Sequence, residues 1–166
     1  MTNNPGDPKA AFNCAVDLLS HQDRSEKDIL ERLLKRGFEV SAAADAIIKL
    51  KEKHYLDDKR MASHYIATHL SEQSLAQLKY KLMRKGIGSE DIAAAISELD
   101  EEAIDESDSL RCRQAVAVLE FLKKKKFDNN DPSRDKILAS LSRKGFSYDA
   151  IREGMTLFEE EQSGEL

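Results

Sequence analysis

The sequence predicts an all-α protein, built as an elongated tandem array of three three-helix repeats. One motif occurs three times, as LLKRGF (Leu33 to Phe38), LMRKGI (Leu82 to Ile87) and LSRKGF (Leu141 to Phe146). About 40% of the residues are hydrophobic, 34% are charged and Trp is absent, a composition that favours helices with large solvated faces. No segment shows the alternating apolar pattern of a strand.

Apolar residues recur at fixed offsets from the three aligned glycines. They stand eight and four residues before each glycine, and six, ten and thirteen residues after it. Spacings of three and four place residues on one helical face, so each motif is predicted to join two amphipathic helices. The residues at these offsets are Ile29, Leu33, Ala43, Ile47 and Leu50, then Leu78, Leu82, Ile92, Ile96 and Leu99, then Ile137, Leu141, Ile151, Met155 and Phe158.

A further helix is expected before each junction. The expected stripes are Ala11, Ala15, Leu18 and Leu19 within 10–19, then Met61, Tyr65 and Ile66, then Val116, Leu119, Phe121 and Leu122.

Helix starts are marked by capping residues. Ser25 with Asp28 three residues later resembles a capping box, and Asp57 can cap the helix that follows it. Pro132, after Asp131, is expected at a first helical position.

These signals give repeats at 9–53, 57–105 and 109–160, followed by a disordered tail at 161–166. Between the second and third repeats, Glu98 to Leu110 holds seven acids and no base. This segment is either the frayed end of a long helix or a hinge.

Composition also bounds the cellular context. The formal charge of −5 excludes a polycation that coats nucleic acid by bulk attraction, so an anionic partner needs a local basic patch. The N-terminus lacks the layout of a secretory signal, and no apolar run is long enough for a membrane span. Cys14 and Cys112 lie far apart, without a CxxC pair. We therefore expect a cytoplasmic protein without a disulfide or zinc site.

Two basic residues precede each junction glycine. Cations in the last turn complement the negative end of the helix dipole, worth roughly 0.3–1 kcal/mol each, and a glycine just past a helix forms a left-handed C-cap. Threefold recurrence also fits a shared role in binding an anionic partner. Both roles can hold together. The pairs are Lys35–Arg36, Arg84–Lys85 and Arg143–Lys144.

The densest positive region lies on the helix expected before the third junction. It is either a solvated face or a contact for phosphates or an acidic protein surface, because four adjacent lysines repel one another unless something offsets them. Its residues are Arg111, Arg113, Lys123, Lys124, Lys125 and Lys126.

The sequence contains no recognisable set of catalytic residues. Asp57 and Asp58 are better explained as a helix cap and a first-turn acid than as a catalytic or metal-binding pair. The four histidines form no i,i+4 pair with one another or with cysteine, and no nucleotide-binding or nucleophile motif occurs. We expect a protein that is not an enzyme and needs no cofactor or metal.

The ordered set of motifs resembles the RecX family of bacterial recombination regulators. The resemblance rests on RSEKDILERLLKRGF (Arg24 to Phe38), YLDD (Tyr55 to Asp58) and KLMRKGI (Lys81 to Ile87), and covers roughly residues 10–160. The segment EQSLAQLKYKL departs from the family pattern, since it lacks the glycine and arginine expected near Ser74 to Gln77.

The resemblance implies a curved array, a crescent that lies in the groove of the RecA filament on single-stranded DNA. Such proteins lower the ATPase, strand-exchange and co-protease activities of RecA. We expect this chain to act as a monomer, with weak contact to DNA and none to a membrane, through the basic residues named above.

Two other functions stay open. Three-helix modules often place one helix in the DNA major groove, so the chain could be a direct DNA-binding protein built from helix-turn-helix-like units. Against this, the helices after the junctions, such as 41–50 and 89–99, are rich in alanine or acids rather than in basic residues. The third possibility is a helical-repeat scaffold for an unrelated protein.

Overall fold

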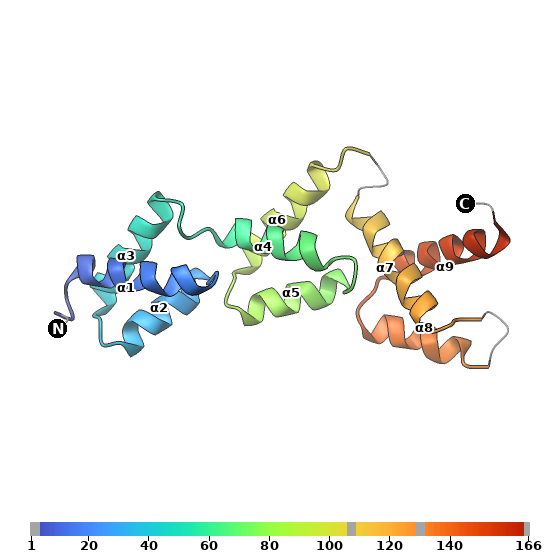
Figure 1. Cartoon of the computed structure of the whole chain (residues 1–166), viewed down its shortest axis with the longest axis horizontal. Helices are drawn as coiled ribbons and strands as arrows, with labels where there is room; N and C mark the ends of the chain where they lie inside the picture. The colour runs from blue at the N-terminus through green and yellow to red at the C-terminus, as the bar shows by residue number, and fades with distance from the viewer. Residues whose placement is uncertain (1–3, 106–108, 129–131, 165–166) are drawn as a thin grey trace. The chain divides into compact units, whose positions relative to one another are not determined.

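The computed structural model describes residues 4–105, 109–128 and 132–164. Within these ranges the chain forms nine α-helices and no strand, which confirms the predicted all-α class (Figure 1). The helices are α1 (Pro8–His21), α2 (Glu26–Lys35), α3 (Val40–Glu52), α4 (Asp58–His69), α5 (Leu75–Arg84), α6 (Ser89–Glu101), α7 (Leu110–Lys124), α8 (Arg134–Arg143) and α9 (Tyr148–Ser163).

The helices pack as two compact units. Unit 1 comprises Met1–Ala62 and Leu82–Ala94, and unit 2 comprises Ser63–Lys81 and Ala95–Leu166. The division therefore passes through α4, α5 and α6, inside the second predicted repeat. The repeat boundaries at 9–53, 57–105 and 109–160 stay predictions.

The core of unit 1 lies among α1, α2 and α3. Helix α1 packs against α3 mainly through small side chains, of which Ala11, Ala15, Ala43 and Ala46 are fully buried. Because alanine adds only a methyl group, the two helix backbones can approach closely. The predicted junction positions of this repeat are all buried: Ile29, Leu33, Ala43, Ile47 and Leu50.

The core of unit 2 centres on α7 and α9, which lie against each other (Figure 1). Gly154 of α9 makes this close packing possible, since an added Cβ would lie 2.6 Å from the Cβ of Val118 and 2.8 Å from the carbonyl oxygen of Ala115. The sequence prediction placed Val116 on the inward stripe of α7, and this is wrong. Val116 is exposed, while Val118 is fully buried.

Two of the three predicted helix starts are confirmed. The Asp28 N–H donates to Ser25 Oγ at 3.2 Å, and the Arg60 N–H donates to Asp57 Oδ1 at 2.8 Å. The prediction for Pro132 is wrong. Pro132 lies in a turn and α8 begins at Arg134, while Asp131 falls outside the described residues.

The tail and the acidic segment differ from expectation in part. Residues 161–163 were predicted to be disordered but form the last turn of α9, which is capped by Gly164 in the left-handed conformation with φ 77°. Residues 165–166 fall outside the described part. In the acidic segment, α6 extends to Glu101, and 106–108 are not described. Among the described helices, none has the length and apolarity that crossing a bilayer would require.

All three junction glycines adopt the predicted left-handed conformation, with φ of 89° at Gly37, 90° at Gly86 and 81° at Gly145. After each glycine, a backbone N–H donates at 3.2 Å to the carbonyl of the leucine five residues earlier. The pattern is a Schellman motif, whose buried apolar pair holds the turn closed. The donor and acceptor pairs are Phe38 and Leu33, Ile87 and Leu82, and Phe146 and Leu141.

We predict that alanine substitutions at Gly37 and Gly86 differ in cost. Gly37→Ala should lower the free energy of unfolding by about 1 kcal/mol, through the positive φ alone, because nothing lies within 4 Å of the added Cβ. Gly86→Ala should cost at least about 1 kcal/mol more, since its Cβ would lie 2.9 Å from Ser25 Oγ and 3.1 Å from the Cβ of Lys27. Urea unfolding followed by circular dichroism measures both, and equal costs would contradict the packing argument.

Candidate partner-binding surface

Two of the junction turns are fixed by a buried serine from an earlier helix start. In unit 1, Ser25 Oγ donates to the Lys85 carbonyl at 2.5 Å while accepting the Asp28 N–H. In unit 2, Ser74 Oγ donates to the Lys144 carbonyl while accepting the Gln77 N–H at 3.2 Å. One hydroxyl thus satisfies the N-terminus of one helix and a carbonyl just past the C-terminus of another.

Both serines are almost fully buried, with 1% of Ser25 and 0% of Ser74 exposed. The sequence identified Ser25 as a cap but not its distant carbonyl partner, and it missed Ser74 altogether. A signal was present, because a serine stands twelve residues before each of the three junction glycines.

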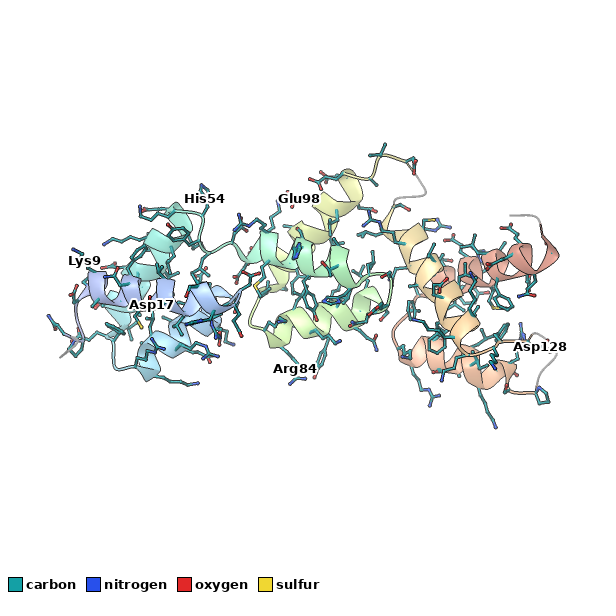
Figure 2. All side chains as sticks on the ribbon, in the orientation of Figure 1. Lys9, Asp17, His54, Arg84, Glu98 and Asp128 are labelled. Carbon is teal, nitrogen blue, oxygen red and sulfur yellow. The ribbon has the colours of Figure 1, made fainter. Side chains whose placement is uncertain are left out.

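The side chains of all three basic pairs are exposed. Because the Lys85 carbonyl points to the buried serine, the turn is anchored by its backbone and the side chain is not needed for that contact. Figure 2 shows the Arg84 side chain extending away from the ribbon at the end of α5. The structure thus assigns the helix-ending role to the junctions, and binding by the basic pairs stays a proposal. All six members are exposed: Lys35, Arg36, Arg84, Lys85, Arg143 and Lys144.

The first junction differs from the other two. Gly37 has an open surface, without a serine against it. The Arg36 guanidinium lies 2.8 Å from the Cys14 sulfur, so this side chain turns towards α1.

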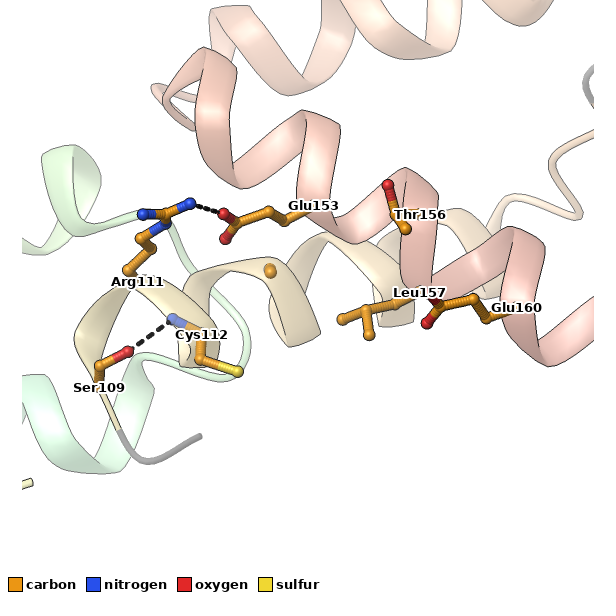
Figure 3. Close-up of a pocket in the computed structure, with 8 residues that line it drawn as sticks. Ser109, Arg111, Cys112, Glu153, Thr156, Leu157 and Glu160 are labelled. Carbon is orange, nitrogen blue, oxygen red and sulfur yellow. Dashed lines mark hydrogen bonds and ion pairs between the residues drawn. The ribbon is translucent and has the colours of Figure 1, made fainter. Parts of the chain in front are cut away.

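Some of the basic residues predicted on α7 are engaged within unit 2. Arg111 forms an ion pair with Glu153 of α9 beside a cavity of about 330 Å³ (Figure 3). The hydrogen bond from Arg111 lowers the pKa of Glu153 below its ordinary value. Arg113 is partly buried.

The four-lysine run is divided by the end of α7. Lys123 lies on the helix and pairs with Glu161 at 2.7 Å and Glu120 at 3.4 Å, and its hydrogen bond to Glu161 raises its pKa. Lys126 lies beyond the helix with φ 50°, in the position that glycine occupies in the junction motifs, and the Phe127 N–H donates to the Leu122 carbonyl at 3.0 Å. The run therefore also ends a helix.

The N-terminus of α2 holds a second set of charges in unit 1. The Asp28 carboxylate receives hydrogen bonds from Arg24 at 2.8 Å and Arg32 at 2.9 Å. Burial alone would raise the pKa of Asp28, but the hydrogen bonds and charges of the two arginines outweigh it, so this pKa lies below 3.8.

Asp58 has the opposite environment. Its carboxylate accepts the Glu26 N–H at 3.0 Å, so it caps α2 as well as opening α4. Burial, with the nearby charges of Asp91 and Glu26, raises the pKa of Asp58 above 3.8 despite that hydrogen bond. Lys51 binds Glu26 at 2.8 Å, and this contact raises the pKa of Lys51. Among the described residues, no group of three or more His, Cys, Asp or Glu side chains is arranged to hold a metal ion.

Comparison with known families gives a consistent match. Residues 11–50 match the family described as RecX, first three-helix domain. Three curated proteins named regulatory protein RecX, from Bacillus pumilus, Clostridium perfringens and Bacillus subtilis, are each 33% identical to this chain. These matches cover 86%, 82% and 92% of this chain, and 53%, 63% and 56% of the relatives. The chain thus spans a little over half the length of the curated relatives it matches.

Solved structures show the same fold. The crystal structure of RecX from Lactobacillus salivarius matches with a TM-score of 0.73 at 22% identity, over 92% of this chain and 97% of that one. A second crystal structure, of regulatory protein RecX, matches with a TM-score of 0.69 at 24% identity, over 87% of this chain and 71% of that one.

We predict that Ser25→Ala destabilises unit 1 by about 2–3 kcal/mol, since it removes a helix cap and leaves the Lys85 carbonyl without its donor. Ser147→Ala is the matched control. Ser147 accepts the Ala150 N–H at 3.2 Å as an N-cap, and its loss should cost about 1 kcal/mol. Urea denaturation of both variants gives the comparison, and equal losses would mean that the contact with Lys85 contributes nothing.

We predict opposite pH effects for two carboxyls of unit 1. Asp28 has a lowered folded pKa, so it stabilises the fold above pH 3.8, and this is lost as pH falls through the folded value. Asp58 has a raised folded pKa, so its contribution is fully present below 3.8 and is lost as pH rises through the folded value. Asp58→Asn should therefore gain stability relative to the parent as pH rises above 3.8. Carboxyl NMR titration with unfolding at several pH values tests this, and a pKa of Asp58 below that of Asp28 would refute it.

Proposed function

From the premise that this chain belongs to the RecX family, we propose that it is a regulator that binds the RecA filament on single-stranded DNA. Binding lowers the ATPase, strand-exchange and co-protease activities of RecA. The protein acts in the cytoplasm as a monomer, and it does so by occupying a surface rather than by chemistry of its own.

The support comes first from the relatives. Each of the three curated proteins compared is named a regulatory protein, and the match extends over at least 82% of this chain. RecA as the partner rests on the family resemblance of the junction motifs.

The observation that carries the proposal is the form of the junctions. In the second and third, a buried serine holds the turn by its backbone carbonyl, while two cations stay exposed beside it. Since the turns are held by buried contacts, their charges are presented from rigid positions, which reduces the entropy lost on binding. A net charge of −5 leaves such local patches as the means to approach an anionic filament groove.

The alternative helix-turn-helix function is less well supported. In α3, the exposed residues include Val40, Ile48 and Lys49, and α6 opens with two acids, Glu90 and Asp91. A helix that reads the major groove needs a denser set of basic or polar donors than these helices carry.

We predict that the protein slows the DNA-dependent ATPase of RecA at near-stoichiometric ratios. The double variant Arg84→Gln with Lys85→Gln should inhibit less, and its binding should depend less on salt, because each lost phosphate contact removes a released counterion. The fold should change little, since the Lys85 contact with Ser25 uses the backbone carbonyl.

The matched control is Arg111→Gln with Lys123→Gln, which removes the same charge from side chains already paired with Glu153 and Glu161. Inhibition should fall for the junction variant and hold for the control. Unchanged RecA turnover at a large excess of the parent protein would refute the proposed function. Equal inhibition by all variants would restrict the second basic pair to ending its helix.

A further inference from the structure

The contacts made by Ser25 and Ser74 are built in the same way, and we call each of them a serine joint. In each joint the serine hydroxyl donates to the carbonyl of the residue before a junction glycine, which is Lys85 or Lys144. One joint lies within unit 1 and the other within unit 2. The chain therefore uses one type of contact twice to hold a helix start against a junction that lies 60 or 70 residues further along.

A second polar contact supports each serine joint. Asp58 of α4 accepts the Glu26 N–H at 3.0 Å, and Gln114 of α7 accepts the Leu75 N–H at 2.8 Å. In both cases the donor is the residue directly after the joint serine. A serine joint is thus an interface between a helix start and elements that follow it in the sequence, rather than a single hydrogen bond.

Each serine joint also depends on the absence of a side chain at the junction glycine. A Cβ added at Gly86 would lie 3.1 Å from the Cβ of Lys27, and one added at Gly145 would lie 2.8 Å from the Cβ of Ala76. Lys27 and Ala76 both stand two residues after a joint serine. A junction can therefore form a serine joint only where glycine leaves this space open.

Each unit also carries one half of a serine joint whose other half is not seated on it within the described residues. In unit 1, the first junction has the same left-handed glycine, Gly37, but nothing lies within 4 Å of an added Cβ there. In unit 2, Ser133 stands at the start of α8, twelve residues before its junction glycine, as the two joint serines do. Ser133 is only half-buried, whereas the two joint serines are almost fully buried.

We propose that copies of this chain associate head to tail, with Ser133 of one copy forming a serine joint with the Gly37 junction of the next. The two halves fit because each is one side of a contact that the chain already makes twice within itself. The contact uses different surfaces on the two copies, so it is heterologous and can join molecules in succession.

The charges around this contact make it weaker than the joint within unit 1. There, the first turn of α2 carries two acids and one lysine opposite the second basic pair. The first turn of α8 instead holds Arg134 and Lys136 with one acid, Asp135, and it would face the first basic pair. Like charges therefore oppose the contact, and salt, which screens exposed charges, should strengthen it. In dilute solution the chain stays monomeric.

A filament changes the weight of such a weak contact. This step rests on the proposed function, because copies bound along one filament lie at a high local concentration. The joint then links neighbouring copies, so that one bound copy favours the binding of the next. Regulation of RecA by this chain is therefore cooperative, whereas the joint itself needs no RecA and can be tested without it.

The first experiment measures self-association of the full chain by sedimentation equilibrium at rising protein concentration. The average mass of the parent should rise, and more so at about 1 M than at about 0.1 M salt. Gly37→Ala should weaken association about fivefold or more, because its Cβ would overpack the joint. Gly164→Ala is the matched control, since Gly164 also has a positive φ and open space around an added Cβ. It should associate like the parent, and a melting curve checks the fold of each variant.

Disulfide trapping identifies the two surfaces. In a background with Cys14→Ser and Cys112→Ser, one sample carries Gly37→Cys and a second carries Asp135→Cys. Asp135 stands two residues after Ser133, so the joint brings the two Cβ atoms close to the roughly 3.5–4.5 Å that a disulfide needs. Mixing the samples under mild oxidation should give a covalent dimer.

The matched control for trapping uses Asp149→Cys in place of Asp135→Cys. Asp149 is also an exposed acid two residues after a serine at a helix start, in this case Ser147 at the start of α9. This pair should trap at least about tenfold more slowly, because no joint raises its effective concentration.

Several outcomes would overturn the inference. They are a parent mass that stays constant at both salt concentrations, equal losses for Gly37→Ala and Gly164→Ala, or equal trapping by the control pair. Covalent dimers formed by the Gly37→Cys sample alone would indicate a symmetric contact and would overturn it as well.

Inhibition of the RecA ATPase is measured separately on the parent and both glycine variants. Self-association without inhibition would refute the proposed function alone. Inhibition that rises with the same non-cooperative dose dependence in the parent and in Gly37→Ala would refute the linking of copies on the filament, while leaving the proposed function in place.

Discussion

A buried serine hydroxyl that joins one helix start to another helix end is the contact on which the rest of this structure depends. Ser25 and Ser74 each accept the N–H of the third residue of their own helix and donate to the carbonyl of a lysine 60 or 70 residues away. The turn can come this close only because a glycine follows the lysine. A side chain at Gly86 or Gly145 would meet a neighbouring atom at 2.9 or 2.8 Å.

Local periodicity made much of the fold predictable. The leucine four residues before each glycine is fully buried in all three repeats, and the left-handed glycines are where the motif places them. Such features depend on residues within one or two helical turns. Other features depend on which helix packs against which, and sequence spacing does not reveal that. Gly154 is required by the crossing of α7 and α9, and the carbonyl partner of Ser25 comes from a different repeat.

The charges of the candidate surface likewise depend on helix packing that sequence spacing does not reveal. The prediction from the sequence treated four adjacent lysines as one patch. In the structure, Lys123 points towards α9 and Lys125 lies beside Phe121. Of the two acids that pair with Lys123, Glu161 lies in the segment expected to be a disordered tail. That segment is rich in acids, a composition that by itself suggests disorder. The segment is helical instead, because α9 packs against α7 through buried residues such as Phe158.

Helix ending and the proposed binding role of the junctions are compatible, because the two roles use different atoms. At Lys85 and Lys144 the backbone carbonyl is committed to a buried serine, whereas the ammonium group is at the surface. Replacing the side chain therefore leaves the anchoring hydrogen bond in place, and replacing the serine leaves the charge in place. Stability and partner affinity can thus vary independently in a single turn. For the same reason, a repeat protein can keep one junction motif for folding while its exposed residues differ from repeat to repeat, as Arg36 near Cys14 and Lys144 near Phe121 already do.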